Sequence, residues 1–261
     1  MKLFATDMDG TFLDDQKQIP IKNLHLLEQL KKKDYKIAVC TGRPLDGIFM
    51  YFLNSDGLVD YYVANNGSVI FDVKKEKIIS EKSISMSDIK LLLDFSNKME
   101  LDIHFITRDH IVNYKKKVGI YMALDAYLVN MEIHFKDFDS YSNEVILKAL
   151  ITGEEEIIAK IETEIPKELQ MVFNFTLSAK NNIDVTYNDT SKGNAIKLIQ
   201  ELNGIMKNDT VAIGDQKNDI SMFESSGLSI AMENSHEDVK SRADIIGPNN
   251  NNGLYNLLEI L

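Results

Sequence analysis

Two aspartates two residues apart, Asp7 and Asp9, are the side chains of this sequence whose type and spacing most directly indicate chemistry. They follow a short apolar run, residues 3–5, and side chains at positions i and i+2 of an extended chain project to the same side. Two carboxylates held that close repel each other unless a cation or a shared proton relieves them. Mg²⁺ suits such ligands, because it takes one or two carboxylates together with phosphate oxygens of a substrate. The pair therefore predicts a Mg²⁺ site just past the end of a strand.

Residues 7–11 also allow two structural interpretations. Gly10 permits a sharp turn and the hydroxyl of Thr11 can cap the next segment, as in an ordinary Asx turn. A calcium loop is the other possibility, but an EF-hand loop needs more oxygen ligands at alternating positions. Phe12 and Leu13 stand where those ligands should be. The calcium loop is therefore excluded, whereas the turn remains an alternative.

A second motif, Thr41-Gly42-Arg43, follows a predicted strand at residues 36–40. Its hydroxyl and its backbone N–H groups can open the next helix, where unpaired amides and the helix dipole favour an anion. The alternative is a plain helix N-cap.

A third motif, Ser191-Lys192-Gly193, opens a predicted helix. Lys192 can reach a phosphate and compensate nearby carboxylates, although a lysine at a helix start is usually exposed and is slightly disfavoured by the dipole.

A fourth motif follows the apolar run at residues 211–213. Asp215 comes at the carboxyl end of that predicted strand, and Asn218 and Asp219 follow at the entry to a helix. Metal ligation by Asp215, supported by the other two, fits this chemistry, and a turn with an N-cap is the alternative. The four motifs together favour one shared site over four separate turns.

Alternating strands and helices must position these motifs. The alternation predicts an α/β fold with a doubly wound parallel sheet, helices on both faces and functional residues at the carboxyl ends of the strands. The predicted strands are residues 2–6, 36–40, 61–64, 210–213 and 228–231, and the predicted helices are residues 21–33, 45–53, 192–202, 219–225 and 253–261.

The pattern changes in the middle of the chain, which predicts an inserted α+β unit. We expect a catalytic core of residues 1–82 and 187–261 and an inserted cap domain of residues 83–186. Within the cap, the sequence predicts helices at residues 87–99 and 153–164 and strands at residues 145–151 and 171–175.

The composition of the 261 residues limits the possible partners. The net charge of −11 argues against nucleic acid or an anionic membrane as the main partner, since both require clustered positive charge. The single cysteine, Cys40, cannot form an internal disulfide, and no signal peptide or long apolar run is present. A cytoplasmic location is therefore expected. The five histidines show no zinc-binding spacing.

The four motifs resemble those of the haloacid dehalogenase (HAD) superfamily. The matching stretches are Asp7-Met8-Asp9-Gly10-Thr11, Thr41-Gly42-Arg43-Pro44, Ser191-Lys192-Gly193, and Gly214-Asp215 through Asn218-Asp219. The insertion between the second and third motifs is similar to the branch with a C2B-type cap (type IIB). Asn65-Asn66-Gly67 is similar to the NNG turn of its Cof-type sugar-phosphate phosphatases. The resemblance covers the whole chain, and in the cap it is architectural.

This resemblance implies a role for each motif residue. Asp7 would be the nucleophile that becomes an aspartyl-phosphate, and Asp9 would protonate the leaving oxygen and then activate water. Mg²⁺ would be held by the Asp7 carboxylate, the backbone carbonyl of Asp9, and Asp215, with Asp219 supporting these ligands. The phosphoryl group would lie among the amide of Met8, Thr41, Gly42, Lys192 and Asn218.

The implied function is Mg²⁺-dependent hydrolysis of small phosphorylated metabolites such as sugar phosphates. A phosphomutase using the same aspartyl-phosphate is an alternative. A non-catalytic sensor of phosphate ligands is a further one, but a sensor needs neither Asp7 nor Asp9. The cap should select the leaving group. Its polar candidates carry no assigned role and are His104, Arg108, His110, His134 and Asp184.

Overall fold

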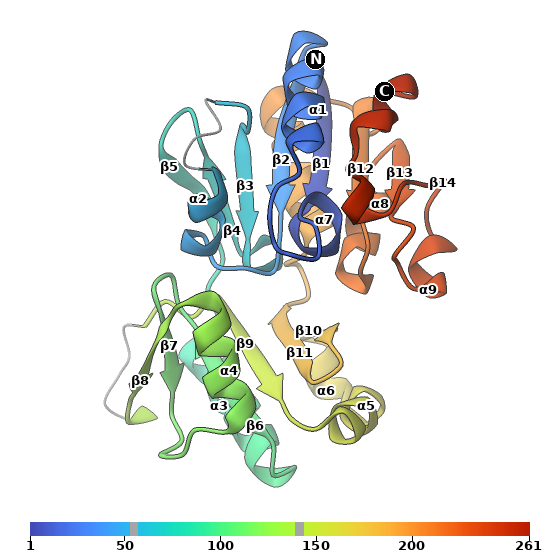
Figure 1. Ribbon diagram of the computed structural model, residues 1–261. Helices are drawn as coiled ribbons and strands as arrows, with labels where there is room; N and C mark the ends of the chain where they lie inside the picture. Colours follow the sequence, from blue (N-terminus) through green and yellow to red (C-terminus); the bar gives the residue numbers. More distant parts are fainter. Residues whose placement is uncertain (53–56, 139–143) are drawn as a thin grey trace.

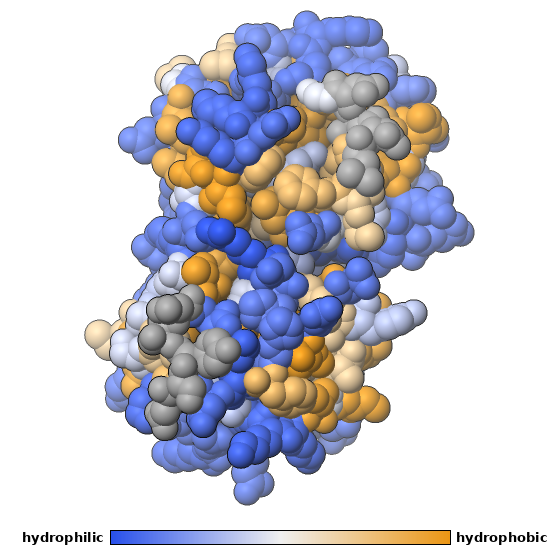
Figure 2. Space-filling model, turned by 90° about the vertical axis from the view of Figure 1, so that its left-hand side faces the viewer, coloured by the Kyte–Doolittle hydropathy of each residue, from blue (hydrophilic) through white to orange (hydrophobic). Residues whose placement is uncertain are grey.

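The computed structural model describes residues 1–52, 57–138 and 144–261 and has two lobes, each built around its own β-sheet (Figure 1). The larger sheet has eight strands in the order β14-β13-β12-β1-β2-β3-β4-β5, and the smaller has six in the order β10-β11-β9-β6-β7-β8. Both chain termini lie in the lobe of the larger sheet. Hydrophilic side chains predominate at the waist between the lobes (Figure 2).

The larger sheet is parallel over six of its strands. These strands are β1 (Lys2–Asp7), β2 (Tyr35–Cys40), β3 (Tyr61–Ala64), β12 (Thr210–Gly214), β13 (Leu228–Ala231) and β14 (Ile245–Ile246). The predicted doubly wound α/β sheet is thus confirmed. The sequence analysis did not anticipate β4 (Val69–Asp72) and β5 (Lys77–Glu81), which extend the sheet as an antiparallel hairpin.

Helices cover both faces of this sheet, because successive side chains of each strand point to opposite sides. Phe4 of β1 belongs to one hydrophobic cluster with Leu27 of α1 and Ile48 of α2, whereas Leu3 packs on the other face with Ile196 of α7. The helices of this lobe are α1 (Ile21–Lys32), α2 (Asp46–Phe52), α7 (Lys192–Asn203), α8 (Ile220–Glu224) and α9 (Glu237–Lys240).

Two predicted helices of this lobe need comment. The segment expected to close the chain as a helix, residues 253–261, forms only a short 3₁₀ helix, Tyr255–Glu259. Gly253 has a φ of +73° and a ψ of 167°, which no right-handed helix contains, so the segment begins only after Leu254, and Leu254 and Leu257 pack into the core. The predicted helix at residues 45–53 corresponds to α2, and its last residue lies outside the described part of the chain.

The second lobe packs helices α3 and α5 on one face of its mixed sheet, where Ile89 and Ile158 join Ile103 and Ala149 in one cluster. Its helices are α3 (Met86–Lys98), α4 (Ile120–Val129), α5 (Glu155–Glu164) and α6 (Lys167–Gln170). Its strands are β6 (Asp102–Ile106), β7 (His110–Asn113), β8 (Glu132–Phe135), β9 (Lys148–Thr152), β10 (Phe173–Ala179) and β11 (Asn182–Tyr187).

The chain crosses between the lobes twice, after β5 and after β11 (Figure 1). We therefore propose the division expected from the sequence, a core of residues 1–82 and 187–261 with a cap of residues 83–186. Among the described residues, no helix is long and apolar enough to cross a membrane.

The strand register brings the predicted motifs to one edge of the larger sheet. Asp7 of β1 is aligned with Cys40 of β2, and Thr6 is aligned with Ile213 of β12. The loops that follow β1, β2 and β12 therefore emerge side by side at the carboxyl ends of their strands.

Candidate active site

Asp7 occupies the end of β1, and the turn that follows brings its neighbours against β12. Gly10 has a φ of +78°, and a Cβ atom there would lie 2.4 Å from Oδ2 of Asp215. Thr11 donates a 2.9 Å hydrogen bond from Oγ1 to Oδ1 of Asp215. Glycine is therefore required at position 10 both for the backbone conformation and for the close approach of the two loops.

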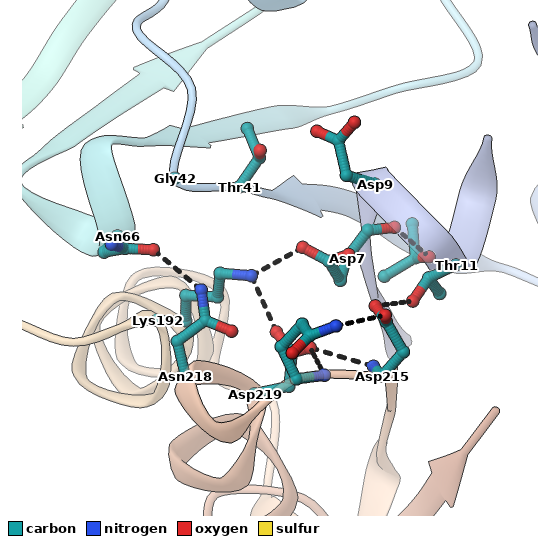
Figure 3. Close-up of polar contacts among 12 residues, drawn as sticks. Asp7, Asp9, Thr11, Thr41, Gly42, Asn66, Lys192, Asp215, Asn218 and Asp219 are labelled. Atoms are coloured by element: carbon teal, nitrogen blue, oxygen red, sulfur yellow. Dashed lines mark hydrogen bonds and ion pairs between the residues drawn. The ribbon is translucent and has the colours of Figure 1, made fainter. Parts of the chain in front are cut away.

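Lys192 lies at the start of α7 and is buried, with 1% of its surface exposed. Its Nζ donates to Oδ1 of Asp7 at 2.5 Å and to Oδ1 of Asp219 at 2.6 Å (Figure 3). Burial disfavours the charged lysine, but the negative charges of Asp219 and Asp7 outweigh it and raise the pKa of Lys192. Lys192 is thus a buried cation that joins the first and fourth motifs.

Three buried carboxylates, those of Asp7, Asp215 and Asp219, offer oxygen atoms within 4.8 Å of one another. Burial raises the pKa of Asp7 well above its usual range; Lys192 opposes this shift, and the charges of Asp219 and Asp215 add to it. Burial and the charge of Asp219 raise the pKa of Asp215 to about 6. Oδ2 of Asp7 is buried and has no hydrogen-bond partner in the described part of the chain. An all-oxygen site with an unsatisfied carboxylate oxygen fits a hard cation such as Mg²⁺.

Asp219 also organises the loop after β12. Its Oδ2 accepts hydrogen bonds of 2.9 Å from the backbone N–H groups of Asp215 and Gln216. Gln216 in turn donates from Nε2 to Oδ2 of Asp215 at 3.0 Å. Asp219 therefore lies within the carboxylate cluster and also fixes the backbone that carries Asp215, and the supporting role expected for it stays a prediction.

Asp9 points away from this cluster and binds two cations. Arg43 donates to it from Nε at 2.6 Å and from Nη2 at 2.7 Å, and Lys17 donates from Nζ at 2.8 Å. Although burial raises the pKa of Asp9, the hydrogen bonds and charges of Arg43 and Lys17 bring it down to about 2. The side chain of Asp9 is thus ionised near neutral pH. The metal contact expected from its backbone carbonyl stays a prediction.

A cavity of about 430 Å³ lies between the lobes above these residues. Its core-lobe wall includes five predicted site residues, Asp7, Asp9, Thr41, Gly42 and Asn218, together with Lys17, Arg43 and Tyr51. The cap wall includes Asp125, Leu128, Lys148, Ser178 and Asp184. Lys192 lines a smaller adjoining pocket of about 150 Å³, which Asn218 shares.

Two placements differ from the sequence analysis or go beyond it. Thr41-Gly42-Arg43 does not open a helix, because α2 begins only at Asp46, and the motif lies in the preceding loop, where Oγ1 of Thr41 accepts from the amide of Arg43 at 3.2 Å. Met8 is buried beneath the site, and the phosphate contact of its amide stays a prediction.

The sequence analysis missed several residues that complete the site. Arg43 was part of a quoted motif but received no role, and Lys17 and Thr11 were not assigned, although each contacts a motif aspartate. Lys148 and Asp184 come from the cap, where no motif marks them, and Asp184 was named only among several polar candidates without a role. Their burial within strands, which distinguishes them from other charged residues, is visible only in the structure.

Comparisons with known proteins agree with this geometry. A family model described as haloacid dehalogenase-like hydrolase matches residues 4–258. The putative phosphatase YxeH of Bacillus subtilis is 28% identical over 253 residues, covering 96% of this chain and 94% of the relative. The 5-amino-6-(5-phospho-D-ribitylamino)uracil phosphatase YcsE of Bacillus subtilis is 28% identical over 250 residues and covers 96% and 91%. The solved structure of BT4131, a subclass IIB sugar phosphatase, aligns with a TM-score of 0.83 at 24% identity, covering 100% and 98% of the two chains.

Proposed function

The chain belongs to the haloacid dehalogenase-like hydrolases and is a phosphatase of that family, and we propose that it hydrolyses small phosphomonoesters through a phosphoryl group carried on Asp7. The observation that carries this proposal is the state of the Asp7 carboxylate. Asp7 lines the cavity, its Oδ1 accepts from Lys192, and its Oδ2 is buried with no hydrogen-bond partner among the described residues. With substrate bound, one oxygen of this carboxylate would bind Mg²⁺ and the other would attack phosphorus.

Negative charge on the phosphate and on the carboxylate must be neutralised before the carboxylate can attack. Mg²⁺ bound by Asp7 and Asp215, with Asp219 beside them, would supply positive charge for the phosphoryl oxygens and lower the repulsion. Lys192 supplies a second positive charge next to Oδ1 of Asp7. The hydroxyl of Thr41, the amide of Gly42 and the side chain of Asn218 line the same cavity and can donate to the equatorial oxygens.

We propose that Asp9 acts as the base in the second step. Its ionised carboxylate, beside Asp7 on the cavity wall, is the form that accepts a proton from the attacking water. Asp9 can protonate the leaving oxygen in the first step only if Arg43 and Lys17 no longer bind its carboxylate. We propose that the substrate phosphate draws these two cations away, which raises the pKa of Asp9 when the proton is needed.

The size and lining of the cavity support small polar leaving groups. About 430 Å³ is within the range of small-molecule sites, and the cap contributes both charged and apolar side chains to its wall. Two similar proteins are named for a phosphorylated ribityl compound and for sugar phosphates. We therefore propose sugar phosphates and related metabolites as the substrate class. A cytoplasmic location is proposed from the single buried cysteine.

The proposal is tested by phosphate release from p-nitrophenyl phosphate and a panel of sugar phosphates, with Mg²⁺ and with EDTA. Wild type should release phosphate only with Mg²⁺, and Asp7→Asn should release none while still folding cooperatively. Asp34→Asn, a change at an exposed aspartate, is the matched control and should keep full activity. Release by Asp7→Asn at a rate near that of wild type would remove Asp7 from the nucleophile role. Transfer of the phosphoryl group to a second sugar would identify a mutase.

A further inference from the structure

A chain of side-chain hydrogen bonds runs from the cap to the candidate phosphate site through Asn66. Asn66 lies in the turn Asn65–Gly67 and is 95% buried. Its Nδ2 donates to Oδ2 of Asp184 on β11 of the cap, and its Oδ1 accepts a 3.0 Å hydrogen bond from Nδ2 of Asn218 (Figure 3 shows the second contact). A core side chain therefore touches both a cap residue and a phosphate-site residue.

The cap end of this chain is a buried ion pair. Asp184 is 3% exposed and accepts from Lys148 at 3.2 Å and from Ser178 at 3.1 Å. Lys148 also donates a 3.0 Å hydrogen bond to the backbone carbonyl of Gly42 in the core lobe. Burying such a pair is costly unless its remaining hydrogen-bonding capacity is satisfied. Asn66 and Gly42 provide these remaining hydrogen bonds, to Asp184 and Lys148 respectively, only while the cap lies against the core lobe.

The backbone around Asn66 is held firmly enough to transmit this contact. The amide of Asn66 donates to the carbonyl of Thr41 at 3.0 Å, and that of Asn65 donates to the carbonyl of Arg43 at 2.9 Å. Gly67 has a φ of +104°, and a Cβ atom there would lie 2.3 Å from the carbonyl oxygen of Ser191. The turn Asn65–Gly67 is thus hydrogen-bonded to the second motif, at Thr41 and Arg43, and packs closely against the third motif, at Ser191.

The chemistry of the partners fixes which way each amide faces. An ionised carboxylate only accepts hydrogen bonds, so Asp184 requires the Nδ2 end of Asn66. The Oδ1 end of Asn66 then faces Asn218 and takes one of its two side-chain N–H groups, which leaves the other for a phosphoryl oxygen. Without Asp184 in place, either end of the Asn66 amide can face Asn218, and its Nδ2 end would turn the donor of Asn218 away.

We propose that Asn66 is a positioning residue that couples docking of the cap, through Asp184, to the orientation of the Asn218 amide at the phosphate site. The inference rests on the proposed function, since it takes Asn218 to bind the phosphoryl group. Phosphate is then held tightly only when the cap is closed over it. An open enzyme admits substrate and releases product, and a closed one binds the reacting phosphate.

The test uses variants that preserve the backbone at position 66. Asn66 has a φ of +56°, a conformation that glycine, asparagine and aspartate adopt readily. Asn66→Gly removes the side-chain amide, and Asn66→Asp places a second carboxylate next to that of Asp184. Combining Asn66→Asp with Asp184→Asn exchanges the two groups, so that the new amide at position 184 donates to the new carboxylate at position 66. That carboxylate still accepts from Asn218, and the total charge is unchanged.

Two quantities are measured for each variant: the dissociation constant of inorganic phosphate with Mg²⁺, by calorimetry, and kcat/KM for p-nitrophenyl phosphate. Asn66→Gly should weaken phosphate binding about 10-fold, the scale of one hydrogen bond to a charged group. Asn66→Asp should lower both quantities further, and adding Asp184→Asn should restore them to within about 3-fold of wild type. Asn130→Gly, at an exposed asparagine with a φ of +54°, is the control and should change neither.

Phosphate binding by Asn66→Gly equal to that of wild type would overturn the inference, as would a double variant no better than Asn66→Asp alone. Thermal unfolding of each variant separates a loss of fold from a loss of positioning, and the rescue by the exchanged pair cannot arise from a general loss of stability. Failure of the proposed function would look different, because wild type itself would then release no phosphate from any substrate. The calorimetric arm still tests the coupling in that case.

Discussion

At the active site, three buried carboxylates lie close together and one buried ammonium group, that of Lys192, contacts two of them, so negative charge is in excess. Lys192 donates to one oxygen each of Asp7 and Asp219, and Oδ2 of Asp7 has no hydrogen-bond partner within residues 1–52, 57–138 and 144–261. Such a cluster is costly to bury, and the raised pKa values of Asp7 and Asp215 express that cost. A divalent cation relieves it by balancing the charge, which makes metal binding and folding stability interdependent.

The first prediction concerns pH and Mg²⁺. The pKa of Asp215 is raised from 3.8 to about 6, so the metal-free folded protein binds this proton more tightly than the unfolded chain does. Metal-free stability should therefore rise as pH falls from 7 through 6, and Mg²⁺ must displace protons below that range. Saturating Mg²⁺ should raise the unfolding temperature more at pH 7.5 than at pH 5, measured by scanning calorimetry. An equal increase at both pH values would contradict the assignment, and Asp215→Asn should lose most of the effect.

The second prediction concerns the buried cation. Lys192→Met should lower the free energy of unfolding of the metal-free protein by about 3 kcal/mol or more, because two buried carboxylates lose their partner. It should also slow turnover by about 10²-fold or more through loss of transition-state stabilisation. Urea unfolding and steady-state kinetics measure the two effects. Lys197→Met changes an exposed lysine of the same helix and should leave both near wild type.

At the residue scale, the sequence allowed Asp7, Thr41, Lys192 and Asp215 to be placed together because each follows or flanks a predicted strand or helix end. The partners of Asp9 could not be predicted in the same way. Lys17 lies in one loop and Arg43 in the loop after β2, and both side chains contact Asp9. These contacts depend on loop conformations, which the hydrophobic periodicity of a sequence does not predict.

At the scale of elements, the packing of α7 against α8 sets the position of Lys192. Gly193 directly follows Lys192, and its amide donates to Oγ of Ser221 at 3.1 Å. A Cβ atom at Gly193 would lie 2.0 Å from the carbonyl oxygen of Ser221. The absence of a side chain at this position therefore permits the close approach that carries Lys192 to Asp7.

The third prediction follows from that contact. Gly193→Ala should destabilise the protein by about 1–3 kcal/mol through overpacking and should lower kcat/KM because Lys192 is displaced from Asp7. Gly153→Ala is the matched control, since a Cβ atom there would meet only ordinary contacts at 3.7 Å. Chemical unfolding and kinetics of the two variants provide the measurement. Equal effects of both substitutions would show that the α7–α8 contact does not position the site.

Elements of the core were easier to predict than those of the cap. Parallel strands such as β2 and β12 are nearly continuous apolar runs between clear turn signals, and both were predicted within one residue at each end. The cap strands β7 and β8 are short and mix polar with apolar residues, and β9 carries the buried Lys148. The sequence analysis predicted neither β7 nor β8, because each has only four residues of mixed polarity, whereas β9 overlaps the predicted strand at residues 145–151.

At the scale of the whole molecule, the cavity has one wall from each lobe, and a substrate must fit between them. In the function that we propose, the groups of the core wall act on the phosphate and those of the cap wall contact the leaving group. Such an arrangement would separate the reaction, which is common to all substrates, from the choice of substrate. The contacts of Lys148 with Gly42 and of Asp184 with Asn66 hold the two walls together.

The fourth prediction is a limit on substrate size. Free phosphotyrosine should be hydrolysed, whereas a peptide of about ten residues that contains phosphotyrosine should have a kcat/KM lower by about 100-fold or more, because the cap cannot close over it. Both substrates have the same leaving group at the phosphate, so a difference in kcat/KM reflects the space available under the cap and not the chemical step. Comparable values for both would show that the cap does not close during turnover.

The central claim, that the phosphoryl group passes through Asp7, is tested most directly by trapping the intermediate. The enzyme is quenched during turnover of p-nitrophenyl phosphate with Mg²⁺ and treated with borohydride, which reduces an acyl phosphate to an alcohol, and the peptides are sequenced by mass spectrometry. We expect homoserine in place of aspartate at position 7, only when both substrate and Mg²⁺ are present. Turnover with an unmodified Asp7, or with reduction at another carboxylate, would contradict the mechanism.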